Sequence, residues 1–324
     1  MKFTFGVLAY NHERMIIETL ESIKYQIVNY GEGYDIEIII TDDCSKDRTT
    51  EIIENWLDSN RKLFIKVDCH FNKKNFGVVK NYQYIINNIG ENNFKIIAGD
   101  DVFSSQNIFK TYDNLRNNNI VTFLELDFNE KGVYYQEGKI INFFYHMTKK
   151  KSNRYNLKNM RRGSYFNTPS TIYSKQLYNE SNAEKINKEF TLFEDDPTWY
   201  AMIKNGAEIV FIPQNIVLYR IHNQSISNSG KINVRFHNEL DKLLRIYKKD
   251  AKGLEKLYIW FRLHSNIPKY INLSIYINKF LEIYRKKKVV NNIEYVRFKK
   301  KVDLIKQREN TYYSYITSQI DKHI

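Results

Sequence analysis

Hydrophobic and polar positions follow two alternating patterns through roughly the first 125 residues. Short apolar runs at residues 3–9, 35–41, 64–69 and 94–98 have the length and composition of buried strands. Between the first two runs, Ile16, Leu20, Ile23 and Ile27 recur with helical spacing, and residues 79–89 show a similar pattern. Strands that alternate with helices predict a doubly wound α/β domain.

Polar residues mark where several of these elements should begin. Asn11 can cap the helix that contains Ile16, and either Ser45 or Asp47 can cap the next helix. That second helix is expected to bury Ile52, Ile53, Trp56 and Leu57.

The pattern is looser after a strand-like run at residues 120–128. Residues 146–163 are basic and rich in asparagine, which predicts a mobile loop or short helix near the site. Asp196 and Pro197 start a further helix that Gly206 ends, and residues 208–213 and 216–220 resemble strands.

From Phe236 onward the spacing of apolar residues predicts amphipathic helices. We therefore expect a catalytic domain over residues 1–235 and a basic, aromatic-rich helical appendage over residues 236–324. The positions that indicate these helices are Leu243, Leu244, Tyr247, Leu254, Leu257, Tyr258, Phe261, Ile275, Phe280, Ile283 and Tyr284.

Positive charge is concentrated in this helical region. Residues 236–324 contain 20 Lys and Arg against 9 Asp and Glu, a surplus of 11 within a total net charge of +13. Such a surface suits an anionic partner, such as phospholipid headgroups, a lipid-diphosphate carrier or an acidic glycan. A solvated basic face without a partner is the alternative.

The remaining composition bears on the compartment. Cys44 and Cys69 lack the spacing of a metal site and are too few for a disulfide framework, so we expect reduced core residues. Met1 leads directly into a strand-like run, and no apolar block approaches 20 residues. These features predict a cytoplasmic protein that does not span a membrane.

Candidate chemistry gathers at the ends of the predicted strands. Asp100 and Asp101 follow Gly99 at one strand end, and two adjacent carboxylates with oxygen ligands suit Mg²⁺ or Mn²⁺ bound to a diphosphate. Asp42 and Asp43 end a neighbouring strand, where they could accept hydrogen bonds from a ribose or a base. Either doublet could equally be ordinary turn and capping chemistry.

Two further segments carry polar groups that a cleft could use. One carboxylate among Glu194, Asp195 and Asp196 could act as a general base, although helix capping also explains the cluster. His222 follows Arg220 two positions later and could be a ligand or an ordinary core or surface histidine.

Six segments in order resemble the family 2 glycosyltransferases of the GT-A fold. They are TFGVLAYNHE, IIITDDCSKDRT, NFGVVKN, IIAGDDVF, FEDDPTWY and YRIHNQSIS, and together they span residues 1 to about 230. The resemblance implies a Rossmann-like domain that binds a nucleotide-sugar and an inverting transfer of its sugar to a hydroxyl group of an acceptor glycan. It also implies that base and ribose are held by Ala9, Tyr10, Asn11, Glu13, Asp42 and Asp43.

The same resemblance gives roles to the other segments. It places Gly77 and Lys80 beside the donor, Asp101 and His222 on Mn²⁺ or Mg²⁺ with Asp100 adjacent, and Arg220 facing the diphosphate. Asp195 is implied to be the catalytic base. Relatives of this kind act on bacterial surface polysaccharide, lipooligosaccharide or teichoic-acid-like glycans, and uridine is their commonest donor nucleotide. The resemblance therefore implies a UDP-sugar that carries a hexose or an N-acetylhexosamine.

The chain departs from the family pattern at two positions. Ala98 stands where many relatives have the first Asp of a D-x-D motif, and Cys44 stands where glycine is common. A sugar nucleotidyltransferase and a non-catalytic module that binds an anionic polymer are the alternative functions. The first would need a glycine-rich basic loop after the first strand, and for the second we find no nucleic-acid motif.

Overall fold

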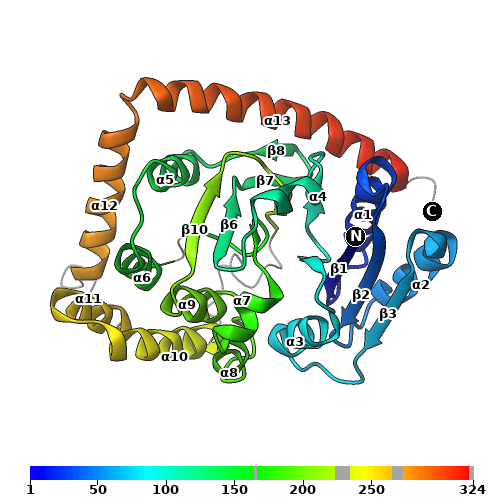
Figure 1. The fold of residues 1–324 in the computed structure, drawn as a ribbon, viewed down its shortest axis with the longest axis horizontal. Coiled ribbons are helices and arrows are strands. Elements are labelled where there is room, and N and C mark those ends of the chain that lie inside the picture. Colours follow the sequence, from blue (N-terminus) through cyan, green and yellow to red (C-terminus); the bar gives the residue numbers. More distant parts are fainter. Residues whose placement is uncertain (164–165, 223–233, 265–272, 321–324) are drawn as a thin grey trace.

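The computed structural model describes residues 1–163, 166–222, 234–264 and 273–320 (Figure 1). It has the predicted α/β fold, with a parallel Rossmann-like sheet and additional C-terminal helices. The strands are β1 Lys2–Ala9, β2 Asp35–Asp42, β3 Lys66–Phe71, β4 Asn93–Ala98, β5 Val102–Phe103, β6 Asn119–Phe123, β7 Leu126–Asn129, β8 Gly132–Tyr134, β9 Thr171–Ile172, β10 Glu208–Ile212 and β11 Val217–Arg220. The helices are α1 Ile16–Tyr30, α2 Thr49–Asn60, α3 Val78–Asn88, α4 Ile108–Thr111, α5 Glu137–Met147, α6 Asn153–Arg162, α7 Lys175–Glu180, α8 Ala183–Asn187, α9 Asp196–Lys204, α10 Val234–Asp250, α11 Gly253–Leu263, α12 Leu273–Val289 and α13 Ile293–Ile320.

The four strands of the first sheet are parallel and run in the order β3-β2-β1-β4. The register sets Ala9 opposite Asp42 and Leu8 opposite Ala98. Because the strands point the same way, their carboxyl ends finish at one edge of the sheet, where open α/β sheets bind ligands. The apolar runs predicted as strands are confirmed.

The predicted helix faces are also confirmed, except that Ile52 is only partly buried. The capping of the first helix is wrong. Asn11 lies several residues before α1, in a left-handed conformation with φ of 54°, and its Oδ1 accepts a hydrogen bond from the Lys46 N–H at 2.8 Å. At the start of α2, Asp47 Oδ1 accepts from the Thr49 N–H at 3.1 Å, whereas Ser45 bonds to Asp42. Asn11 therefore joins two strand-end loops instead of capping a helix.

Two smaller sheets extend the fold, in the orders β5-β11-β7-β8 and β10-β6-β9. Residues 120–128 form β6 and β7 rather than one strand. β11 lies between β5 and β7, antiparallel to the first and parallel to the second. This pairing brings the segment that ends at Arg220 next to the loop after β4.

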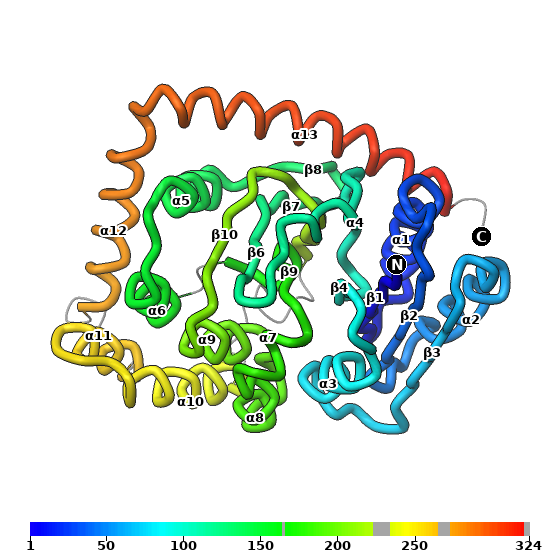
Figure 2. Tube along the Cα trace, viewed as in Figure 1, coloured from blue at the N-terminus to red at the C-terminus, as the bar shows by residue number. Residues whose placement is uncertain are grey.

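The helices α10 to α13 run around the sheets as a frame, and α13 returns to α1 (Figures 1 and 2). The rings of Tyr25 and Tyr312 lie 4.8 Å apart, and the buried Glu309 carboxylate accepts hydrogen bonds from Ser105 N–H and Oγ at 2.8 and 2.7 Å. One hydrophobic cluster contains both sheet and C-terminal helix residues. The C-terminal helices therefore contribute to the hydrophobic core of the sheets. The domain boundary at residue 235 stays a prediction.

Two other predictions, on the cysteines and on the apolar face of α12, differ from the structure. Cys44 is partly buried and Cys69 is exposed, so the cysteines are free but are not core residues. Residues 146–163 contain the end of α5 and the short helix α6, so the short-helix alternative for this segment is confirmed. α12 forms as predicted, but its apolar side chains Ile275, Phe280, Ile283 and Tyr284 are exposed. None of the helices in the described ranges combines the length and apolar character needed to cross a bilayer.

Candidate active site

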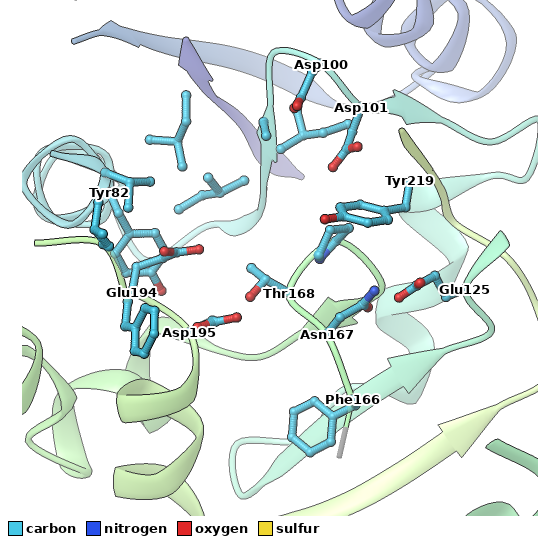
Figure 3. A pocket seen from close by; sticks show the side chains of 18 of the residues that line it. Tyr82, Asp100, Asp101, Glu125, Phe166, Asn167, Thr168, Glu194, Asp195 and Tyr219 are labelled. Carbon is cyan, nitrogen blue, oxygen red and sulfur yellow. The ribbon is translucent and has the colours of Figure 1, made fainter. Parts of the chain in front are cut away.

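A cavity of about 1040 Å³ opens at the carboxyl ends of β1 and β4. Carboxylates stand on three sides of it (Figure 3). Asp100 and Asp101 lie on one side, Glu194 and Asp195 on the opposite side, and Glu125 on a third. The cavity therefore collects acidic groups from segments far apart in the sequence.

Asp43 organises one wall of the cavity by binding backbone amides. Its Oδ1 accepts from the Phe76 N–H at 2.7 Å and its Oδ2 from the Gly77 N–H at 2.9 Å. Gly77 has φ of +90°, and a Cβ there would lie 2.5 Å from the Thr191 carbonyl oxygen. This position therefore requires glycine, and the wall is fixed before any ligand binds.

The loop after β1 forms the adjoining wall. Tyr10 lines the cavity and is 43% exposed, so its ring is available to a ligand. The Asn11 N–H donates to Ser45 Oγ at 2.8 Å, and Asp42 accepts from the Ser45 N–H at 2.8 Å. Asn11 and Asp42 thus hold the two loops together, with Tyr10 projecting from them.

Asp100 pairs with His222 across the strand-end loops. His222 Nε2 lies 2.9 Å from Asp100 Oδ2, and both residues line the cavity. Burial opposes ionisation of Asp100, but the hydrogen bond with His222 and the nearby His12 hold its pKa below the usual value. His12 also lines the cavity, and burial lowers its pKa. Asp100 is therefore ionised at neutral pH.

Asp101 is more deeply buried and is held by backbone. Its Oδ1 accepts from the Arg220 N–H at 2.9 Å, and burial together with Asp100 raises its pKa well above the usual value. The Arg220 guanidinium lies behind this loop, where it donates to the Asp100 carbonyl at 2.6 Å and pairs with Glu18 at 2.6 Å. It also lies over the Phe128 ring, 4.3 Å from the centroid.

Asp195 and Glu194 form the opposite wall, just before α9. Asp195 Oδ1 accepts from the Asp196 N–H at 2.6 Å, so Asp195 caps the helix and also faces the cavity. Burial raises the pKa of Asp195, and burial with the charge of Asp195 raises the pKa of Glu194 to about 8. A carboxylate with a raised pKa is a stronger base at the cavity wall.

Glu125 and Lys139 are cavity residues that the sequence analysis missed. Lys139 forms ion pairs with Glu125 and with Asp127, the second at 2.8 Å. Burial raises the pKa of Glu125 to about 7 despite this partner. Glu125 lies where the predicted strand 120–128 breaks, and a charged residue inside an apolar run was the available signal.

The cavity brings together many of the residues predicted to act in the site. Glu13, Lys80, Asp42 and Arg220 are not among its lining residues: Glu13 accepts from the Arg48 N–H at 3.2 Å, and Lys80 is exposed in the first turn of α3. The later part of the YRIHNQSIS segment, residues 223–227, lies outside the described residues. The predicted residues that do line the cavity are Ala9, Tyr10, Asn11, Asp43, Gly77, Asp100, Asp101, Asp195 and His222.

Comparison with known proteins identifies the family. The model for glycosyl transferase family 2 matches residues 4–186, more than half of the chain. The chain belongs to glycosyl transferase family 2. It is 26% identical over 215 residues to a processive diacylglycerol beta-glycosyltransferase of Mycoplasma genitalium. That match covers 60% of this chain and 57% of the relative, so the chain spans little more than half of the relative's length.

Solved structures of glycosyltransferases share the fold. S. aureus TarS 1-349 in complex with UDP-GlcNAc superposes with a TM-score of 0.58 at 18% identity, covering 85% of this chain and 76% of that chain. The mannosyltransferase PcManGT of Pyrobaculum calidifontis, in complex with GDP-Man and Mn²⁺, covers 99% of this chain and 86% of its own, with a TM-score of 0.51 at 11% identity. These similarities confirm the GT-A type of fold.

Proposed function

We propose that this family 2 member transfers a hexose or N-acetylhexosamine from a UDP-sugar to a hydroxyl group of a cell-surface glycan, with inversion at the anomeric carbon. The observation that carries the proposal is one cavity with Asp100 and His222 on one side and Asp195 opposite. TarS, which shares the fold, has been solved with UDP-GlcNAc, which supports a UDP-sugar donor. Family membership favours sugar transfer over a nucleotidyltransferase or a non-catalytic polymer-binding module.

In the proposed reaction, Asp195 accepts the proton of the acceptor hydroxyl. The hydroxyl oxygen forms the new bond to the anomeric carbon, and the bond from that carbon to the diphosphate oxygen breaks on the opposite face. Tyr10, Asn11 and the wall held by Asp43 and Gly77 would bind the nucleoside. Because the pKa of Asp195 is raised by burial, transfer should become faster as the pH rises through that pKa.

A divalent cation fits the Asp100 side of the cavity only if the protein and the donor diphosphate both supply ligands. No group of three or more His, Cys, Asp or Glu side chains able to hold a metal is found within the described ranges. Asp100 and His222 would therefore hold Mn²⁺ or Mg²⁺ together with the donor diphosphate, as Mg²⁺ commonly binds. This differs from the predicted pair of Asp101 and His222. The ion would neutralise charge on the departing diphosphate.

Arg220 and Asp101 would act by positioning. Arg220 fixes the Asp100 carbonyl and, through its own N–H, the Asp101 carboxylate. We assign Glu13 and Asp42 to holding the nucleoside-binding loops. Lys80 is exposed and does not line the cavity, so we assign it a contact with the donor at the cavity rim only. A cytoplasmic enzyme that works at the inner face of a membrane, on a glycan or lipid-linked glycan, is consistent with the similarity to a processive diacylglycerol beta-glycosyltransferase.

A thermal-shift panel tests the donor. UDP-, GDP- and dTDP-sugars are compared with and without Mn²⁺, because a ligand at about 100 times its Kd adds about 2.7 kcal/mol of stability. We expect a metal-dependent shift with the UDP-sugar that is lost in Asp100→Ala. A protein that shifts with none of these nucleotides would overturn the proposal.

The second test addresses the base. Asp195→Asn should retain the donor-induced shift and lose about 10²- to 10⁴-fold in transfer rate. Asp196→Asn is the matched control, because Asp196 is the neighbouring carboxylate, does not line the cavity and keeps its backbone hydrogen bond to Asp195. Equal losses of transfer in both variants would refute the assignment of Asp195.

A further inference from the structure

The outward face of α12 carries large apolar side chains that are exposed. Tyr276, Phe280 and Ile283 are 52%, 66% and 47% exposed, and their spacing places them on one face of the helix. The opposite face packs on the protein through Ser274 and Val289, which are buried. Figure 1 shows α12 at the edge of the molecule, on the outer side of α5 and α6. We call Tyr276, Phe280 and Ile283 the α12 face.

Basic residues flank this face and extend beyond it. Lys279, Lys286 and Lys287 are exposed on α12. Residues 273–301 contain nine Lys and Arg but only two acidic residues, Glu282 and Glu294, a net charge of +7. Apolar side chains with lysines beside them are typical of helices that lie in the interface of an anionic membrane.

We propose that α12 docks this protein on an anionic lipid bilayer, with Tyr276, Phe280 and Ile283 entering the interface and the adjacent lysines binding phosphate headgroups. A second copy of the chain is the less favourable occupant. Stacking two α12 faces would bring their lysines together, and like charges held close cost free energy. A bilayer instead supplies both an apolar layer and negative charge.

The inner side of α12 connects this face to the active site. Arg285 donates to Asn142 Oδ1 of α5 at 2.5 Å and to Asn159 Oδ1 of α6 at 3.4 Å. Asn142 also lines the cavity. A membrane on the α12 face would therefore lie one helix layer away from the wall of the cavity. Docking would place the acceptor of the proposed reaction at a membrane surface. This placement of the acceptor rests on the proposed function, whereas the docking itself does not.

The test is flotation of the full chain with lipid vesicles, without donor or acceptor. Vesicles of phosphatidylcholine alone are compared with equal parts of phosphatidylcholine and phosphatidylglycerol. We expect binding to the mixed vesicles only, weakened by salt. Lys286→Gln/Lys287→Gln should lower the partition coefficient about fivefold for each lysine removed. Phe280→Ser/Ile283→Ser should lower it at least as strongly.

Matched controls come from exposed residues of the N-terminal half. Lys62→Gln/Lys66→Gln removes two exposed lysines, and Val28→Ser/Ile65→Ser removes two apolar side chains that are 66% and 59% exposed. Both controls should bind vesicles as the unaltered protein does. If the serine variant of α12 fails to fold, the lysine pair still tests the proposal.

Three results would overturn the docking surface. The unaltered protein could fail to bind mixed vesicles, the α12 variants could bind as well as the controls, or the α12 variants could change only the mass measured by light scattering. The last result would assign the face to a second copy. The donor-induced thermal shift, measured on the same samples, separates these failures from failure of the proposed enzymatic function.

Discussion

Arg220 offers a direct test of whether this arginine serves the protein or the ligand. The structure pairs its guanidinium with Glu18 at 2.6 Å, and the side chains of Arg220 and Glu18 are only 8% and 9% exposed. Removing one partner of a buried ion pair leaves the other charge uncompensated, at a cost of about 3–5 kcal/mol. Arg220→Met should lose this much unfolding free energy. Glu18→Gln/Arg220→Met should recover the part that comes from the uncompensated Glu18 charge, but not the part from the hydrogen bond to the Asp100 carbonyl.

Urea unfolding followed by circular dichroism measures both variants. Arg48→Met is the control, because Arg48 and Glu51 form an ion pair of the same type with side chains 69% and 53% exposed. Solvent screens exposed ion pairs, which therefore contribute little to stability, so this variant should remain close to the unaltered protein. A double variant of Glu18 and Arg220 that unfolds at the same urea concentration as Arg220→Met would refute the reasoning.

Three further predictions follow from individual positions. Gly77→Ala should destabilise far more than Gly33→Ala in thermal unfolding, because both have positive φ but only Gly77 would collide, with the Thr191 carbonyl at 2.5 Å; equal losses would contradict this. Burial raises the pKa of Glu194 from 4.5 in the unfolded chain to about 8 in the folded protein, so between these pH values only the unfolded chain has lost the proton. Raising the pH through this range should therefore lower the stability of the unaltered protein by up to about 1.4 kcal/mol per pH unit. Glu194→Gln should flatten that decline in urea titrations at several pH values, and an unchanged slope would exclude Glu194 as its source. Tyr10→Ala should raise the donor Kd about tenfold in a binding titration, with unchanged stability, if the exposed ring stacks on the base.

The first sheet could be predicted because most residues of β1, β2 and β4 are buried, on both faces of the sheet. Predominantly apolar runs such as residues 36–40 indicate the strand position, and parallel strands place their polar ends together. This is why Asp43 and Asp100, 57 positions apart in the sequence, could be assigned to the same site before the fold was known.

The partners of individual side chains could not be predicted in the same way. Asp100 and Asp101 are adjacent, and only the path of the loop decides that Asp100 meets His222 while Asp101 accepts from a backbone N–H. Arg220 shows the same limit, because its partner Glu18 lies 202 residues away on α1. The exposure of the α12 face was also invisible, since an amphipathic pattern does not say which neighbour covers it.

The contact between Ser105 and Glu309 has a consequence for how the chain folds during synthesis. These residues are 204 positions apart, and Glu309 is fully buried where α13 packs on the loop between β5 and α4. During synthesis, Ser105 and the loop that leads to α4 therefore cannot form the contact with Glu309 until α13 has left the ribosome. Closing such long-range contacts slows folding and leaves apolar surface uncovered meanwhile. During this interval the uncovered apolar surface makes the chain prone to aggregate.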